Sequence, residues 1–317
     1  MKKCLLAAAL LSAATISEAG VIRHDVNDQL YRDLAQQTQF AAVGDLLTGT
    51  GNTFNSRCSG TLISSQFVLT AAHCLDDPLT DLVRFAVGGD FYFGADWVVH
   101  ENWNPLASLF AGWDIALLKL DRKVSNVTAA EIYTGSSEIG KIGTHVGFGT
   151  TGNGLTGFNS PSGTKRAGHN EIDELNMAGE GHGRILWNDF DAPAGTDVTQ
   201  GTSMDADINF LLNPIAAYGR SSGVALALEM GIAPGDSGGG YFLQENNQWF
   251  LAGVHSFGAA VDGFQTNFGY GDFSGSTRVS SFSGWITETK ASMTVPEPGT
   301  VFVFISGLLG LMTLRRR

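Results

Sequence analysis

Three residues that lie far apart in the sequence could together form a nucleophile for carbonyl groups. Ser237 lies in the sequence GDSGG at 235–239, and His73 lies in TAAHC at 70–74. A serine hydroxyl needs a neighbouring base to accept its proton, and histidine suits this task because its pKa lies near neutrality. Asp114, in WDIALL between the two, offers a carboxylate to fix the imidazole tautomer. The order His, Asp, Ser therefore predicts acyl transfer at Ser237.

Glycines flank the candidate nucleophile on both sides. Gly235 lets the backbone approach a substrate carbonyl, so we expect the amides of Gly235 and Ser237 to form an oxyanion hole. The two glycines after Ser237 leave room above its hydroxyl. Residues 115–118, which follow Asp114, are apolar and should bury that carboxylate. Attack on an acyl group, with the oxyanion held by backbone amides, is the chemistry indicated.

Other chemistries fit the sequence less well. The pattern around Ser237 also fits the nucleophile elbow of α/β-hydrolases, but there the histidine comes last in the chain order. His255 is the only histidine after Ser237, and no alternation of strands and helices surrounds it. The other histidines lack metal-ligand spacing, so no metal or cofactor is expected: His24, His100, His145, His169 and His182. Five aspartates could hold Ca²⁺, but they lack EF-hand spacing, and solvated charges are the favoured interpretation: Asp189, Asp191, Asp197, Asp205 and Asp207.

Short β-rich runs separated by turn residues must position these groups. Runs of continuous or alternating apolar residues predict strands. They lie at 67–70, 82–87, 115–120, 224–228, 249–254 and 277–279. The stretch 147–163 is rich in Gly, Asn, Thr and Ser, which is typical of a surface loop. A short helix is expected over 280–286, with Ser280 or Ser281 as its N-cap.

Four motifs resemble those of the trypsin/chymotrypsin family of serine proteases. They are CSGTLI at 58–63, LTAAHC at 69–74, DIAL at 114–117 and GDSGG at 235–239. Weaker matches are VHSFG at 254–258 and the stretch from Arg278 to Ile286. The resemblance runs from Val21 to Lys290. It implies an all-β fold of two antiparallel six-stranded β-barrels of chymotrypsin type, with a short C-terminal helix and an active site in the cleft between the barrels.

The resemblance also implies a role for each matching residue. His73 is the general base, Asp114 orients it and Ser237 is the nucleophile. Ser256 would lie beside these three. A backbone segment would pair with the substrate as an added strand, and it consists of Ser256, Phe257 and Gly258.

Departures from the family pattern bear on specificity. The stretch from Asp114 to Ser237 is longer than in trypsins, and Gly240 replaces the usual proline. Gly231 stands where trypsins carry an aspartate for Arg and Lys substrates, and Ile232 follows it, so a basic preference is disfavoured. His255 resembles a pocket histidine of glutamyl endopeptidases, which would suit an acidic substrate residue. The alternative is a histidine packed at the pocket wall.

The family resemblance suggests an activation route. In this family a new N-terminal amine pairs with the aspartate before the nucleophile and shapes the oxyanion hole. Asp236 occupies that position, and Val21 begins an apolar stretch that resembles a mature N-terminus. Signal cleavage after Ala19 would leave Gly20 first, so one more residue would need trimming.

Two cysteines remain once the N-terminal segment with Cys4 is removed. In an oxidising exported compartment, Cys58 and Cys74 can pair and tether the residue next to His73. A free thiol pair is the less favoured alternative.

Both chain ends carry targeting patterns. Residues 1–19 combine Lys2 and Lys3, an apolar run and small residues before a cleavage point, as in a secretory signal peptide. Residues 295–299 read VPEPG, and an apolar stretch of about 15 residues and three arginines follow. This end resembles the PEP-CTERM sorting signal, which an exosortase is thought to process; a tail anchor is the alternative. The protein is therefore expected in the periplasm, at the cell surface or outside, with transient inner-membrane attachment.

The bulk composition bounds the class of protein. The chain has 317 residues, of which 43% are hydrophobic and 16% are charged, as in a globular protein with a sizeable core. The net charge of −12 argues against a nucleic-acid partner, because phosphate binding needs clustered Lys and Arg.

The organisation expected is a signal peptide at 1–19, a protease domain at 20–290, a linker at 291–299 and a sorting segment at 300–317. The function expected is a serine endopeptidase acting on protein or peptide substrates. The alternative is a catalytically silent protease-fold module that binds partners at the cell surface.

Overall fold

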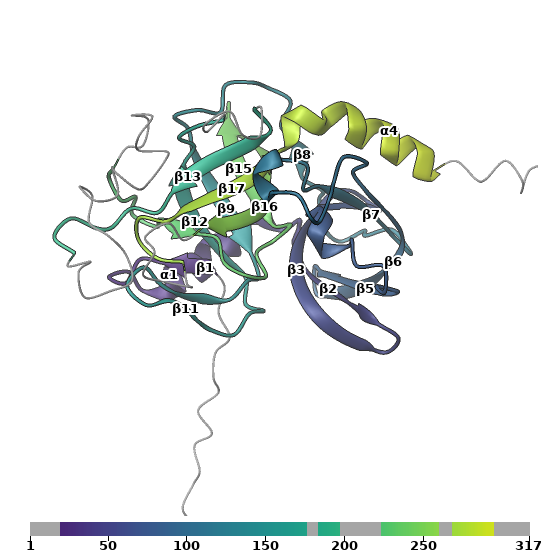
Figure 1. The fold of residues 1–317 in the computed structure, drawn as a ribbon, viewed down its shortest axis with the longest axis horizontal. Coiled ribbons are helices and arrows are strands. Elements are labelled where there is room, and N and C mark those ends of the chain that lie inside the picture. The colour runs from purple at the N-terminus through teal and green to yellow at the C-terminus, as the bar shows by residue number, and fades with distance from the viewer. Residues whose placement is uncertain (1–19, 176–182, 197–222, 260–267, 295–317) are drawn as a thin grey trace, which may run out of the picture.

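Two β-rich halves lie side by side in the computed structural model (Figure 1). The structure describes residues 20–175, 183–196, 223–259 and 268–294. The predicted signal peptide and sorting segment lie outside these residues. Within the described ranges, no helix is long and apolar enough to cross a membrane.

The first half is a closed six-stranded barrel in the order β2-β3-β4-β7-β6-β5. Its strands are β2 (Val43–Thr50), β3 (Thr53–Ser64), β4 (Phe67–Thr70), β5 (Leu82–Val87), β6 (Asp90–Val99) and β7 (Ala116–Leu120). Strand β5 alternates half-buried and buried residues, which is the pattern of a strand with one face on a core. Its buried Phe85 packs in the barrel core with Leu46, Leu62 and Leu118.

The second half is a seven-stranded sheet that curls opposite the barrel. The described strands run in the order β12-β9-β15-β16-β17-β13, and β8 adds to β16. They are β8 (Glu131–Ile132), β9 (Ile142–Gly147), β12 (Arg166–Glu171), β13 (Ile185–Asp189), β15 (Gly240–Glu245), β16 (Gln248–Ala259) and β17 (Phe273–Arg278). A smaller sheet joins β11 (Gly157–Ser160), β10 (Thr151–Asn153), β1 (Gly20–Ile22) and β14 (Met230–Gly231) in that order.

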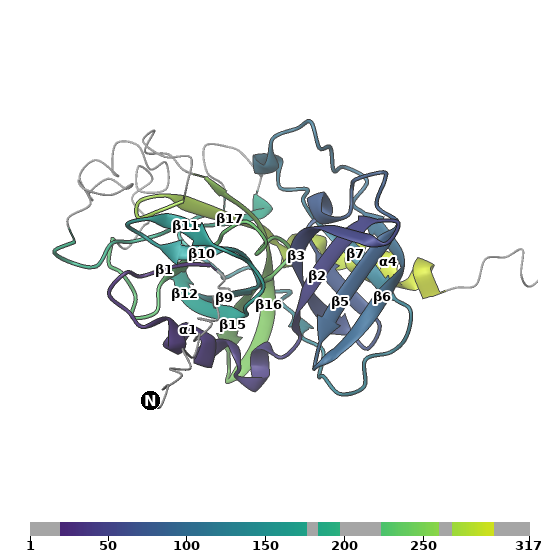
Figure 2. The same ribbon diagram turned by 90° about the horizontal axis from the view of Figure 1, so that it is seen from below.

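Each end of the described chain packs on the half that lies farther from it in sequence. Helix α1 (Asp28–Ala35) begins where Asn27 accepts a hydrogen bond from the Gln29 N–H, and its Asp28 pairs with the buried Arg166 of β12. Helix α4 (Ser283–Thr294) lies beside β7 of the barrel (Figure 1), and buries Ile286 and Met293 in the barrel core. Figure 2 shows α1 below β12 and α4 behind the barrel. The two ends thus cross over between the halves.

The predicted all-β fold of chymotrypsin type with a short C-terminal helix is confirmed. The strands predicted at 67–70 and 82–87 have the observed bounds of β4 and β5. The second half differs in detail from a six-stranded barrel. Strand β8 joins it as a seventh strand, and among the described strands the first and last of the sheet, β12 and β13, are not paired with each other.

Three local predictions need correction. The apolar run 224–228 forms no strand. The predicted loop 147–163 contains β10 and β11, which pair as an antiparallel hairpin, and β10 also pairs with the distant β1. The C-terminal helical region begins with a 3₁₀ turn (Val279–Phe282) after Arg278, with no side-chain cap, and α4 continues to Thr294.

Candidate active site

Strand pairing in the barrel brings His73 and Asp114 together. His73 lies in a 3₁₀ turn (Ala72–Cys74) just after β4, and Asp114 lies just before β7. The two strands are antiparallel neighbours with Thr70 opposite Ala116, so the end of one meets the start of the other. Asp114 Oδ2 lies 2.7 Å from His73 Nδ1, and Asp114 Oδ1 accepts from the His73 backbone N–H at 3.0 Å. One carboxylate thus holds both the ring and the backbone of the histidine.

Hydrogen bonds from the second half complete the surroundings of Asp114. The side chain is fully buried, and Oδ2 also accepts from Ser256 Oγ at 2.5 Å. Thr277 Oγ1 donates to the Asp114 backbone carbonyl at 2.8 Å. Burial lowers the pKa of His73, but the hydrogen bond and the charge of Asp114 outweigh it, and with a smaller contribution from Asp76 the pKa lies above its ordinary value. Asp114 therefore stabilises the protonated imidazole.

A disulfide joins Cys58 of β3 to Cys74, next to His73, with 6.3 Å between the Cα atoms. The predicted pairing is confirmed. The two sulfurs and His73 form a group of close potential metal ligands. Because both sulfurs are consumed in the disulfide, they offer no thiolate to a metal ion.

The turn that carries Ser237 rests against the strand that leads to His73. The Ser237 backbone carbonyl accepts from the Ser59 N–H at 2.7 Å. Gly238 has φ +81°, and a Cβ on it would meet Thr70 Oγ1 at 2.0 Å. Only glycine fits this approach. The nucleophile turn and the end of β4 are therefore in contact, which brings the two halves of the predicted site together.

The predicted oxyanion donors belong to two peptide groups whose carbonyls are hydrogen-bonded. The Gly235 N–H shares a peptide group with the Pro234 carbonyl, which accepts from the Thr150 N–H at 2.7 Å. The Ser237 N–H shares a peptide group with the Asp236 carbonyl, which accepts from the Gly239 N–H at 2.7 Å. Within the described residues, neither donor N–H has a hydrogen-bond partner. Both are thus available to a developing oxyanion.

A cavity of about 360 Å³ lies beside Ser237. Four predicted substrate-binding residues line it: Ile232, Ser256, Phe257 and Gly258. Sequence reasoning missed five more, which are Leu109, Phe158, Ala233, Pro234 and Phe268. Phe158 and Phe268 come from segments without a motif, so only the fold identifies them. The wall of the cavity is mostly apolar.

Two further predicted substrate-binding residues lie outside the cavity lining. Gly231 is buried in β14, and a Cβ on it would meet the Phe268 ring at 2.1 Å, so it makes room for a cavity wall. His255 is fully buried: its Nε2 lies 3.0 Å from His145 Nδ1, and its Nδ1 lies 3.3 Å from the Asp236 carbonyl oxygen. Both ring nitrogens have protein partners, which favours the alternative of a packed histidine over contact with an acidic substrate residue.

Comparisons with known proteins agree with this geometry. The trypsin family model matches residues 33–171, a stretch that contains His73 and Asp114 and ends before Ser237. Brachyurin of Leptuca pugilator is 30% identical over 245 residues, which cover 75% of this chain and 88% of brachyurin. The chain belongs to the trypsin family.

Other proteins match this trypsin-family chain over shorter stretches or in fold alone. Chymotrypsin-C of Bos taurus is 43% identical over 84 residues, which cover 23% of the chain and 30% of the relative. Chymotrypsin-like elastase family member 1 of Macaca fascicularis is 39% identical over 85 residues, which cover 24% and 31%. The chain thus spans about a third of the length of these two relatives. A solved structure entitled HL collagenase has a TM-score of 0.53 at 20% identity, covering 80% of this chain and 95% of that one, and so shares the fold.

Asp236 of this trypsin-family chain is a fully buried carboxylate next to the nucleophile. It accepts hydrogen bonds from the N–H groups of Gly149 at 2.8 Å and Ala233 at 2.9 Å. Burial raises its pKa to about 7. Val21 is also buried and packs in one small core cluster with Ala233. Strand β1, which begins at Gly20, thus lies close to the loop that carries Asp236.

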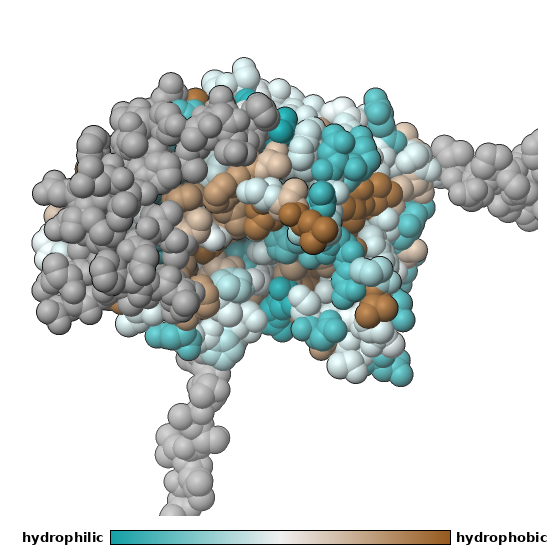
Figure 3. Space-filling view, in the orientation of Figure 1, coloured by the Kyte–Doolittle hydropathy of each residue, from teal (hydrophilic) through white to brown (hydrophobic). Residues whose placement is uncertain are grey.

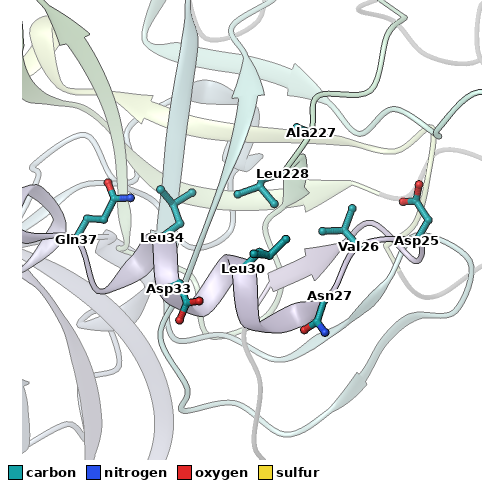
Figure 4. A pocket seen from close by; sticks show the side chains of 9 residues that line it. All are labelled: Asp25, Val26, Asn27, Leu30, Asp33, Leu34, Gln37, Ala227 and Leu228. Carbon is teal, nitrogen blue, oxygen red and sulfur yellow. The ribbon is translucent and has the colours of Figure 1, made fainter.

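A larger cavity, of about 570 Å³, lies between α1 and the segment before β14 (Figure 4). In Figure 4, Leu30 and Leu34 point toward Leu228, whereas Asp33 points away. Its lining contains neither the triad nor the nucleophile turn: Asp25, Val26, Asn27, Leu30, Asp33, Leu34, Gln37, Ala227 and Leu228. We therefore place the candidate active site at the smaller cavity.

One of the aspartates considered for Ca²⁺, Asp189, differs from the expected solvated charge. Asp189 ends β13 and is buried, and its N–H donates to Asp173 Oδ2 at 3.1 Å. Burial and the nearby charge of Asp189 raise the pKa of Asp173 to about 10. The Asp191 N–H donates to Glu229 Oε1 at 2.7 Å. The other three, Asp197, Asp205 and Asp207, lie outside the described residues.

Proposed function

We propose that this chain is an exported serine endopeptidase that cleaves peptide bonds through an acyl-enzyme intermediate. One observation carries the proposal: the His73–Asp114 pair and the Ser237 turn meet at the same end of β4, while the N–H groups of Gly235 and Ser237 stay available. This is the full set of groups that acyl transfer requires.

The proposed mechanism uses these groups in order. Ser237 Oγ attacks the peptide carbonyl as its proton passes to His73 Nε2, and the N–H groups of Gly235 and Ser237 hold the oxyanion. The C–N bond then breaks, and His73 gives its proton to the leaving amine. Water, deprotonated by His73, attacks the acyl-enzyme and releases the acid. Asp114 keeps the proton on His73 Nδ1, so that Nε2 is the basic nitrogen in each step.

We propose that the residue before the scissile bond is apolar. None of the described residues that line the cavity beside Ser237 carries a charge, and Ile232, Phe257 and Phe268 present apolar walls. An Arg, Lys or Glu side chain would lose hydration there without gaining a partner. Figure 3 shows a hydrophobic band across the middle of the face that it presents.

We propose that a new amine at Val21 activates the enzyme. An ammonium group would pair with the buried Asp236 carboxylate and keep it charged. The placement of Val21 in one cluster with Ala233, whose N–H donates to Asp236, supports this route. Export by the 1–19 segment and tail processing by an exosortase-like enzyme are proposals from the sequence.

The rival function is a silent protease-fold module that binds partners at the cell surface. A fluorophosphonate probe distinguishes the two, because it labels only an activated serine. We expect labelling of the wild-type mature protein and none of Ser237→Ala, while Ser256→Ala retains some labelling. Equal labelling of wild type and Ser237→Ala, or none of either, would defeat the enzyme proposal. Cleavage of peptides that differ only in the residue before the scissile bond then tests the apolar preference.

A further inference from the structure

The imidazole of His255 lies directly behind the oxyanion site. Its Nδ1 is 3.3 Å from the Asp236 carbonyl oxygen, and that carbonyl belongs to the same planar peptide group as the Ser237 N–H. The same carbonyl also accepts from the Gly239 N–H at 2.7 Å. Because the peptide group turns as one unit, these two bonds together fix the direction of the Ser237 N–H.

The Asp236 carbonyl determines which ring nitrogens of His255 and His145 donate and which accept. The Asp236 oxygen can only accept, so His255 Nδ1 carries the proton. Burial lowers the pKa of His255 to about 3, which leaves the ring neutral and makes Nε2 an acceptor. His145 Nδ1, 3.0 Å away, must then donate to it. The two rings thus form one directed chain of donors that ends on the Asp236 carbonyl.

Packing holds both rings in place. His145 stacks on Tyr241 with 3.9 Å between ring centroids and 16° between planes, and the Tyr241 hydroxyl donates to the Asn170 carbonyl at 2.9 Å. The backbone of His255 donates to the Gly239 carbonyl at 2.9 Å and accepts from the Gly238 N–H at 2.8 Å. A Cβ on Gly239 would lie 2.9 Å from His255 Nδ1, so glycine there leaves space for the ring.

We propose that His255 is a positioning residue that, supported by His145, acts together with the Gly239 N–H to set the orientation of the Ser237 N–H as an oxyanion donor. This inference rests on the proposed function. His255 would stabilise the transition state rather than the bound substrate, because the Ser237 N–H faces a full negative charge only when the oxyanion forms. Donation to the carbonyl also polarises the peptide group and strengthens its N–H as a donor.

The test compares two substitutions that differ in one donor. His255→Leu removes the donor, whereas His255→Asn keeps an N–H near the position of Nδ1. Loss of one oxyanion donor costs about 10²–10³-fold in kcat, so a misdirected donor should cost about 10–100-fold. For His255→Leu we expect that loss in kcat with little change in KM. Binding of a peptide aldehyde that forms a tetrahedral adduct should weaken by the same factor. His255→Asn should recover most of kcat.

The matched control is His169→Leu, which removes a half-buried imidazole of β12 that contacts Thr144 instead of the nucleophile turn. It should leave kcat and the aldehyde affinity unchanged. An unchanged kcat in His255→Leu, or a change confined to KM, would overturn the proposal. So would a His255→Asn variant as impaired as His255→Leu, provided that thermal unfolding shows both to be folded.

A readout without catalysis separates this inference from the proposed function. In an NMR spectrum, His255→Leu should shift the amide signal of Ser237 far more than that of Gly235, whether or not the wild type is active. If the wild type shows no labelling by the fluorophosphonate probe, the proposed function fails, and the amide signals alone decide the positioning claim. An unmoved Ser237 amide would reject it.

Discussion

Removal of the Cys58–Cys74 disulfide should destabilise the fold by an amount set by its short loop. The bridge joins residues 16 apart. A loop of that length restricts the unfolded chain by about 3 kcal/mol in the chain-entropy model. Both cysteines are nearly fully buried, so the double variant Cys58→Ala/Cys74→Ala also loses some packing. We expect a loss of about 3 kcal/mol or slightly more in the free energy of unfolding.

Thermal and urea unfolding with and without reductant would measure this loss. For a domain of this size, about 3 kcal/mol corresponds to a fall in Tm of about 6–12 °C. Reductant should lower the Tm of the wild type toward that of the double variant and leave the double variant unchanged. Val68→Ala, a core truncation in β4, is the control: its Tm should be lower than that of the wild type and should still respond to reductant.

The decisive result is the response of the wild type once thiol titration shows that the bridge is fully reduced. A Tm that stays the same would mean that the loop entropy argument fails here. A double variant that still responds to reductant would show that the effect does not arise from this bridge.

Three further predictions concern charged groups near the site. Asp114→Asn should lower kcat about 10⁴-fold, because the amide no longer favours the His73 tautomer with a basic Nε2; steady-state kinetics would measure it, and a loss under tenfold would contradict the assigned role. Asp76→Asn should move the acid limb of the kcat/KM profile to lower pH, because Asp76 raises the pKa of His73, whereas the exposed Asp77→Asn should not. In the unprocessed chain, the Asp236 pKa of about 7 lies above its ordinary 3.8, so the native state binds the extra proton and the free energy of unfolding should fall as pH rises between these values. Because buried Asp173 and Glu229 also have raised pKa values, urea titrations should show that slope become shallower, by up to about 1.4 kcal/mol per pH unit, in Asp236→Asn and after cleavage before Val21. A slope that the substitution leaves unchanged would refute the assignment.

The sequence predicted the parts of the site that local chemistry demands. The motifs around His73, Asp114 and Ser237 each need particular residues at fixed spacing, and Gly238 shows why: its φ and its contact with Thr70 exclude a side chain. Strands β4 and β5 followed from apolar patterns that reflect one buried face each. Such signals lie within a few residues of one another.

Features that depend on distant partners were missed. The run 224–228 is apolar, yet Leu228 lines the cavity beside α1 rather than pairing in a strand. β10 forms because it lies next to β1, about 130 residues earlier in the chain. The ring of His255 turns toward His145, 110 residues away, and no pattern around either histidine reveals that contact.

The crossing of the two chain ends has a mechanical consequence. Because α4 packs on the barrel, a pull on the chain beyond Thr294 is transmitted first to β7, where the Lys119 ammonium donates to the Met293 carbonyl. A pull on the chain before Gly20 acts instead on β10 and β14 of the other half. Tension at the C-terminal end therefore acts on the barrel through α4, which follows the second half in the sequence. Tension at the N-terminal end acts on the second half through β1, which precedes the barrel in the sequence.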